Sequence, residues 1–190
     1  MKNIAVFASG SGTNAEQLMK HFEQSSIANV KLVVSSNASA GVLLRASQFK
    51  VPTFILTKKD FVETSHIGDI LRVYHIDFVV LAGFLWHIPP YLIKAYTNRM
   101  VNIHPSLLPL YGGKGMYGER VHQTVIQNQE KESGITIHYV TEGYDEGAPI
   151  FQAKCTVTPE DNAATLAEKV HALEHLHFSR VVEELLLKLD

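Results

Sequence analysis

The sequence has 190 residues, 46% hydrophobic and 19% charged, so it can bury a sizeable core and does not belong to the wholly disordered class. Its formal net charge of −2 offers no broad attraction for nucleic acid or anionic membrane, which favours small-molecule chemistry. No stretch approaches the length of a membrane span, and the single cysteine, Cys155, cannot form an internal disulfide, so we expect a soluble protein of the reducing cytoplasm.

Short apolar runs alternate with stretches of helical length along the first hundred residues. Continuous apolar runs suit strands that are buried on both faces, so they predict a parallel sheet covered by helices. The runs occupy residues 4–8, 31–35, 53–56, 78–82 and 100–103. We therefore expect a doubly wound α/β fold with a mostly parallel sheet.

The second half of the chain has a different texture. In order, it contains a glycine-rich loop at 111–118, a helix near 119–128, and strands at 134–140 and 149–157. We expect these two strands to pair with each other, as an antiparallel addition to the sheet. A long amphipathic helix from Asn162 to Lys188 follows, and one of its faces carries Leu166, Val170, Leu173, Val181 and Leu185. We expect a single domain over 1–190.

The stretch "ASGSGTNAEQL" follows the first strand and opens a helix. Gly10, Gly12 and Ala15 fit the pattern of dinucleotide-binding folds, but the second strand is followed by "SSNAS", without the acidic residue that binds the ribose. The loop also lacks the lysine of a Walker motif. It therefore predicts a phosphate monoester held by backbone N–H groups at a helix N-terminus. The alternative is that Thr13 caps the helix in a capping box with Glu16.

Two polar side chains interrupt the fifth strand, in "MVNIHPSLLP". Asn102 and His104 point to one face because side chains alternate along a strand, and Pro105 ends the strand directly after them. An amide beside an imidazolium suits stabilisation of an oxyanion, where losing one donor costs about 3 kcal/mol. The alternative is a buried polar pair without chemistry. Asp145, in "TEGYDEGAP", either supports His104 or is a solvated turn residue.

The motifs "SGSGTN", "VVLAGF", "NIHPSLLP", "GITIHYV" and "YDEGAPIFQAK", in this order and spacing, resemble the phosphoribosylglycinamide formyltransferase family of purine biosynthesis. The resemblance implies a formyltransferase fold, 10-formyltetrahydrofolate as the formyl donor and no metal. It also implies that the primary amine of glycinamide ribonucleotide attacks the formyl carbon. Asn102 and a protonated His104 would hold the oxyanion, and Asp145 would support the histidine and proton transfer.

The same resemblance assigns the binding residues. It makes 1–100 the phosphate- and nucleotide-binding half and 101–190 the catalytic and folate-binding half. The nucleotide-binding residues that it implies are Gly12, Thr13, Asn14, Gly83 and Glu174. The folate-binding residues that it implies are Phe84, Leu85, Trp86, His87, Ile88, Asn102, Tyr144 and Asp145. The implied partners are small molecules only, without nucleic acid or membrane, and the implied assembly is a monomer or a weak homodimer.

The chain departs from the family pattern in three places. "GFLWHIP" stands where many relatives read "GFMRIL", so Trp86 and His87 replace an arginine and an aliphatic residue. The region around Thr64 supplies no arginine, which some relatives have near the folate tail. The glycine-rich loop 111–118 is longer than usual, and it is either a mobile lid or a passive surface loop.

"HALEH", residues 171–175, matches the H-x-x-E-H of inverted zinc proteases, but Glu183 and Glu184 lie too far along the same helix to complete a compact metal site. A phosphate-binding sensor has no use for a paired amide and imidazole. Methionyl-tRNA formyltransferases and formyltetrahydrofolate deformylases carry an additional domain, for which 190 residues leave no room. We expect a stand-alone transferase, with deformylase-like hydrolysis as the nearest alternative.

Overall fold

The apolar runs of the first hundred residues form the strands that they predict, although β1 and β2 begin earlier than the runs do. The computed structural model describes residues 1–63 and 66–189. The strands are β1 (Lys2–Phe7), β2 (Ala28–Ser35), β3 (Thr53–Ile55), β4 (Phe78–Leu81), β5 (Met100–His104), β6 (Glu132–Tyr139) and β7 (Pro149–Thr156). The helices are α1 (Thr13–Phe22), α2 (Gly41–Gln48), the π-helical η1 (Lys59–Glu63), α3 (His66–Val73), α4 (Pro90–Ala95), α5 (Glu119–Gln127) and α6 (Ala163–Leu187).

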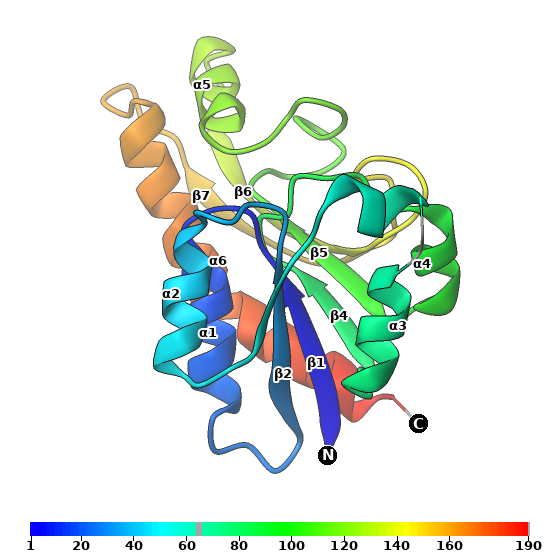
Figure 1. The fold of residues 1–190 in the computed structure, drawn as a ribbon. Helices are drawn as coiled ribbons and strands as arrows, with labels where there is room; N and C mark the ends of the chain where they lie inside the picture. The colour runs from blue at the N-terminus through cyan, green and yellow to red at the C-terminus, as the bar shows by residue number, and fades with distance from the viewer. Residues whose placement is uncertain (64–65, 190) are drawn as a thin grey trace.

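The strands of the described residues form one seven-stranded sheet with the order β3-β2-β1-β4-β5-β6-β7 (Figure 1). Strands β1 to β5 are parallel, β6 is antiparallel to β5, and β7 is antiparallel to β6. The predicted pairing of the last two strands and the predicted antiparallel addition are therefore confirmed. The chain winds outward from β1 to β3 and then returns to β4 on the other side of β1. In open α/β sheets, ligands bind at the carboxyl ends of the strands at such a reversal.

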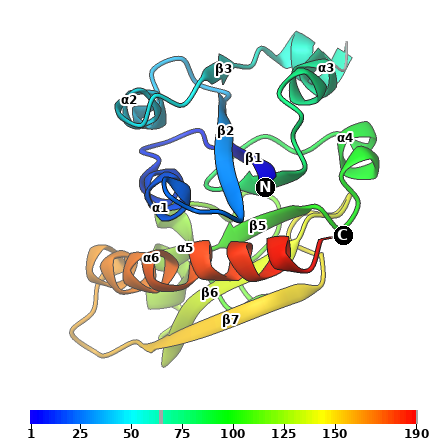
Figure 2. The same ribbon diagram turned by 90° about the horizontal axis from the view of Figure 1, so that it is seen from below.

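Two hydrophobic cores cover the two faces of the sheet, because successive side chains of a buried strand point to opposite faces. Along β1, Ile4 and Val6 pack in the core shared with α1, α2 and α6, whereas Ala5 and Phe7 pack in the core shared with η1, α3 and α4. Figure 2 shows these helices on opposite sides of the sheet. In α6, the predicted apolar face is buried apart from the half-buried Leu173. No helix of the described residues is long and apolar enough to cross a membrane.

The second core ends part of the way along β5 and β6. Met100 still packs in that core, but the next side chains on the same face of β5 are Asn102 and His104. They stand opposite His138 and Thr136 of β6. Val101 and Ile103, on the other face, remain in the first core, as predicted from the alternation. The sheet thus carries four polar side chains on one face, where the helical cover stops.

Candidate active site

A cavity of about 1080 Å³ opens at the carboxyl ends of β1, β4 and β5. Its wall contains every residue for which the sequence predicted a role, although those residues come from both halves of the chain. They are Gly12, Thr13, Asn14, Gly83, Phe84, Leu85, Trp86, His87, Ile88, Asn102, His104, Tyr144, Asp145 and Glu174. The glycine-rich loop lines the same cavity through residues 113–118. The structure brings the predicted site together, and the role of each residue stays a prediction.

The loop between β1 and α1 is built to leave the helix N-terminus uncapped. Gly12 occupies the N-cap position in the left-handed conformation, with φ 77°, and no side chain caps the helix. A Cβ atom at Gly12 would lie 2.5 Å from the Cβ of Val42, so glycine is required by both conformation and space. Thr13 is the first helical residue, so the alternative of a Thr13–Glu16 capping box is wrong. The backbone of α1 therefore presents its first N–H groups to the cavity.

The side chain of Glu16 forms ion pairs and does not cap the helix. It forms ion pairs with Lys20 and with Arg45 of α2. Arg45 also donates from Nε to the carbonyl oxygen of Ser11 at 2.9 Å. These contacts lower the pKa of Glu16, with the hydrogen bond from Lys20 as the largest cause. Arg45 is thus held by Ser11 and Glu16 and does not line the cavity, so the phosphate-binding prediction rests on backbone groups.

A buried polar pair connects the start of α1 with α6. Asn14 donates from Nδ2 to Oε2 of Glu174 at 2.8 Å, and Glu174 is almost fully buried. Burial raises the pKa of Glu174, and the hydrogen bond from Asn14 opposes that rise. Oδ1 of Asn14 is also buried and has no hydrogen-bond partner among the described residues. The corner beside the uncapped helix therefore offers acceptors for polar groups of a ligand. We call residues 10–14 together with Glu174 the phosphate end of the cavity, after the binding that the sequence predicts there.

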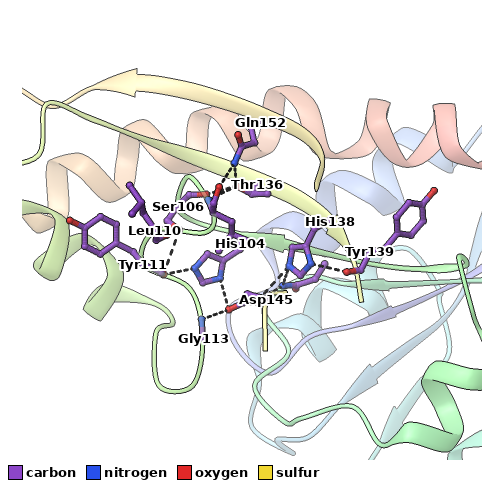
Figure 3. Close-up of polar contacts among 12 residues, drawn as sticks. His104, Ser106, Leu110, Tyr111, Gly113, Thr136, His138, Tyr139, Asp145 and Gln152 are labelled. Carbon is purple, nitrogen blue, oxygen red and sulfur yellow. Dashed lines mark hydrogen bonds and ion pairs between the residues drawn. The ribbon is translucent and has the colours of Figure 1, made fainter. Parts of the chain in front are cut away.

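His104 and Asp145 face each other (Figure 3), and both line the cavity. His104 donates from Nε2 to the carbonyl oxygen of Tyr111 at 2.8 Å, because a carbonyl can only accept. Its Nδ1 lies 3.5 Å from Oδ2 of Asp145. In the neutral ring Nδ1 is therefore the basic nitrogen, and a proton gained there faces a carboxylate. The side chain of Asp145 is 15% exposed, so the alternative of a solvated turn residue is wrong.

The charges of this pair follow from burial and from its neighbours. Burial lowers the pKa of His104, while Asp145 and the Tyr111 carbonyl oppose the shift, so the imidazole is neutral near pH 7. Burial raises the pKa of Asp145, but His138, His104 and the N–H of Gly113 together outweigh it, and the net shift is downward. Asp145 is therefore an ionised carboxylate beside a neutral base.

Two unusual backbone conformations hold this pair in place. Tyr111 and Asp145 have φ of 57° and 56°, in the left-handed region that residues other than glycine rarely adopt. The first directs a carbonyl oxygen at His104, and the second carries the carboxylate. Gly112 lies between them in space, where a Cβ atom would overlap Leu108 and approach the Cβ of Asp145 to 3.3 Å. Such strained positions cluster at functional sites, where the surrounding fold fixes them.

His138 belongs to the same network and was missed by the sequence reasoning. Its Nδ1 donates to the Tyr139 carbonyl oxygen at 2.8 Å, so its Nε2 accepts from Nδ2 of Asn102 at 3.1 Å. The same Nδ2 lies 3.4 Å from Oδ1 of Asp145. His138 therefore fixes which way the Asn102 amide is turned. The available signal was the alternation of Thr136 and His138 along β6, which repeats the Asn102 and His104 pattern of β5.

Aromatic side chains form another part of the wall, made of residues 84–88 together with the segment 141–145. We call it the folate end, after the binding that the sequence predicts there. Phe84 and Trp86 pack against Phe61 of η1 at centroid distances of 5.6 and 5.8 Å. His87 connects the two segments, because its Nε2 donates to the Glu142 carbonyl oxygen at 2.8 Å and its ring lies 4.5 Å from that of Tyr144. Thr64, around which the sequence supplies no arginine, lies outside the described residues.

The two histidines of the zinc-protease motif, His171 and His175, lie on α6 in an environment that does not resemble a zinc site. The rings of His171 and His175 are stacked with their centroids 6.5 Å apart, and Glu174 between them is bonded to Asn14. Within residues 1–63 and 66–189, no group of three histidine, cysteine or acidic side chains is placed to hold a metal ion. The glutamate of this motif therefore belongs to the phosphate end of the cavity.

Comparison with known proteins gives concordant results. The model of the formyl transferase family matches residues 2–182. Phosphoribosylglycinamide formyltransferase of Bacillus subtilis is 35% identical over 191 residues, covering 98% of this chain and 95% of that protein. The chloroplastic phosphoribosylglycinamide formyltransferase of Arabidopsis thaliana is 37% identical over 187 residues. That alignment covers 95% of this chain but only 64% of the plant protein, so the chain spans just under two thirds of that relative.

Solved structures show the same likeness. Glycinamide ribonucleotide transformylase 1 of Symbiobacterium toebii superposes with a TM-score of 0.91 at 30% sequence identity, covering 99% of this chain and 89% of that one. The structure and the sequence comparisons thus agree over nearly the whole chain.

Proposed function

The chain belongs to the formyl transferase family, and from this premise we propose that it transfers the formyl group of 10-formyltetrahydrofolate to the primary amine of glycinamide ribonucleotide, in purine biosynthesis. One observation carries the proposal: a single cavity combines an uncapped helix N-terminus, an aromatic wall, and a basic imidazole paired with a carboxylate. A phosphorylated amine and a planar formyl donor each find a matching part of the wall. The expected cytoplasmic location is part of this proposal.

The two substrates approach the reacting groups from different sides of the sheet edge. The phosphate end packs with α1, α2 and α6, over the first core, whereas Phe84 and Trp86 pack with the second core. Asn102 and His104 stand at the end of β5, between these two regions. The sheet carries strands from both halves of the chain, so we propose one functional domain in which each half contributes to both ends of the cavity.

Asn102, His104 and Asp145 supply the chemistry in this proposal. The amine nitrogen forms a bond to the formyl carbon, and the carbonyl electron pair moves onto the oxygen. Nδ2 of Asn102 turns from its long contact with Asp145 to donate to that oxyanion, while His138 keeps the other N–H occupied. Nδ1 of His104 takes the proton that the attacking nitrogen loses, and the ionised Asp145 stabilises the imidazolium.

Collapse of the tetrahedral carbon reverses the flow of charge. The oxyanion re-forms the carbonyl, the bond to the folate nitrogen breaks, and the imidazolium of His104 donates its proton to that leaving nitrogen. The products are formylated nucleotide and tetrahydrofolate, and His104 returns to its neutral state. The imidazolium implied by the family resemblance thus exists during the reaction, whereas burial keeps the resting ring neutral.

Product analysis tests the proposal. The protein is incubated with 10-formyltetrahydrofolate, with and without glycinamide ribonucleotide, and the products are separated. Formylated nucleotide that forms only when both substrates are present supports the transferase. Free formate produced without the acceptor indicates deformylase-like hydrolysis, and binding of the nucleotide without turnover indicates a sensor; either result overturns the proposal.

A further inference from the structure

His122 is a buried imidazole on the cavity wall for which the proposed mechanism has no use. It lies on α5 between Val121 and Val125, which are buried, and it is only 3% exposed itself. Its Nδ1 is sealed from solvent and has no hydrogen-bond partner among the described residues. More than nine in ten buried polar groups in native proteins are hydrogen-bonded. A ligand in the cavity cannot reach this sealed atom, but Nε2 of the same ring also has no hydrogen-bond partner among the described residues and is not sealed. On a residue that lines the cavity, this second nitrogen indicates that a ligand supplies its partner.

The charge of His122 restricts the kind of ligand group that it can bind. Burial lowers its pKa to about 4, and His171 and His104 lower it further than Glu119 raises it. The ring is therefore neutral at physiological pH and holds no attraction for a phosphate. A neutral imidazole has one N–H donor and one acceptor nitrogen, so it suits an uncharged polar group such as a carboxamide.

The position of His122 identifies the part of the substrate within its reach. His122 lines the same cavity as His104, at the reacting centre, and its helix packs against α6, which carries His171. His171 lines the cavity on the same face of α6 as Glu174, which is bonded to Asn14 at the phosphate end. His122 thus lies between the reacting centre and the phosphate end. A substrate whose amine reacts at His104 and whose phosphate binds at the start of α1 must cross this interval.

We propose that His122 is a substrate-binding residue that hydrogen-bonds the carboxamide of glycinamide ribonucleotide and so sets the specificity for that part of the acceptor. This inference rests on the proposed function. The carboxamide is the polar group next to the reacting amine, whereas the ribose lies nearer to the phosphate and to Glu174. A site built to hydrogen-bond a polar group discriminates strongly against ligands that lack it.

Binding measurements with two ligands test the inference. Titration calorimetry without folate gives the affinities of glycinamide ribonucleotide and of ribose 5-phosphate, which lacks the carboxamide, for the wild-type protein, His122→Leu and His122→Gln. We expect His122→Leu to bind the full nucleotide about tenfold more weakly, and ribose 5-phosphate as the wild type does. His122→Gln keeps a donor and an acceptor near the Nε2 position and should retain most of the affinity. In steady-state kinetics, KM for the nucleotide should rise by the same factor in His122→Leu, with KM for the folate unchanged.

The possible outcomes are distinct. A wild-type protein that does not bind glycinamide ribonucleotide overturns the proposed function. A wild-type protein that binds it, with unchanged affinity in a folded His122→Leu variant, overturns only the role of His122. Equal losses for the nucleotide and for ribose 5-phosphate show that His122 only packs α5 against the cavity, which also overturns it. If His122→Leu does not fold, His122→Phe, which keeps a planar ring, takes its place in the same measurements.

Discussion

The phosphate end and the reacting centre of the cavity are built in different ways. The phosphate end depends on consecutive residues, 10–14, whose backbone conformation exposes the N–H groups of α1. The reacting centre depends on three side chains from distant segments, Asn102 and His104 on β5 and Asp145 after β6. A binding surface made of backbone tolerates changes of side chain, whereas a network of side chains fails when one member is changed.

This difference has an electrostatic counterpart. At the phosphate end, Arg45 is bonded to Ser11 and Glu16 and does not line the cavity, so partial charges of the helix face the cavity. At the reacting centre, a full negative charge on Asp145 lies within 3.5 Å of both His104 and His138. We therefore expect substitutions at the reacting centre to act on kcat and its pH dependence, and substitutions at the phosphate end to act on KM for one substrate.

The largest effect is expected for His104→Asn. Asparagine keeps a hydrogen-bond donor of similar reach but cannot take up and return a proton, so kcat should fall at least 100-fold while both KM values change little. Steady-state kinetics of the purified variant measure this. The matched control is His175→Asn on α6, outside the cavity wall, which should be nearly silent. A loss for His175→Asn with near-normal His104→Asn would contradict the reacting centre and revive the zinc motif.

Asp145→Asn should lower kcat by roughly 10- to 100-fold, because the amide cannot stabilise the imidazolium that forms on His104. The sign of the pH effect follows from the same pair. The carboxylate raises the pKa of His104, so its removal lets burial lower that pKa further. A base of lower pKa stays neutral to lower pH, and the acidic limb of the kcat profile should move toward lower pH. A limb that moves upward, or wild-type kcat at every pH, would assign Asp145 to the turn alone.

The fold was largely predictable because its strands are buried on both faces. An apolar run marks such a strand directly, as in β4. The first residues of β1 and β2 pair through the backbone and include polar side chains, such as Lys2 and Asn29. A search for apolar runs therefore misses the start of these two strands. The antiparallel β6–β7 pair was also predictable, since the two strands are neighbours in the chain. The pairing of β5 with β6 is harder to predict, because a loop and a helix separate them.

The limits of the site prediction follow from that pairing. Asn102 and His104 were found from a local alternation, but His138 contributes only because β6 lies beside β5. His122 was hidden for another reason: a histidine on an amphipathic helix is ordinarily exposed, and only the packing of α5 against α6 buries it. The capping-box alternative for Thr13 fits the local sequence, but it is wrong because the left-handed Gly12 occupies the N-cap position and Thr13 is already helical. Val42 leaves no space for a side chain at Gly12.

A smaller effect, restricted to one substrate, is expected at the phosphate end. Asn14→Ala removes the hydrogen bond to the buried Glu174 and should raise KM for the nucleotide about tenfold, with kcat and KM for the folate nearly unchanged. Thr13→Ala is the matched control, since only its backbone N–H is needed, and it should behave as the wild type does. Gly12 is unsuited to this test because any side chain there meets Val42. A strong effect of Thr13→Ala would show that side chains, and not only backbone, bind the phosphate.

The smallest effect is expected for His87→Ala at the folate end. This variant tests whether the folate end is independent of the reacting centre. His87 donates to the Glu142 carbonyl oxygen and contacts Tyr144, so it fastens the segment that leads into Asp145. The bond is exposed, and a net worth of about 1 kcal/mol corresponds to a rise of about fivefold in KM for the folate. Asp145 is held separately by the N–H of Gly113 at 2.9 Å, so kcat should stay near its wild-type value. If kcat instead falls as far as it does in Asp145→Asn, the carboxylate depends on the loop that binds the folate, and the two regions act as one.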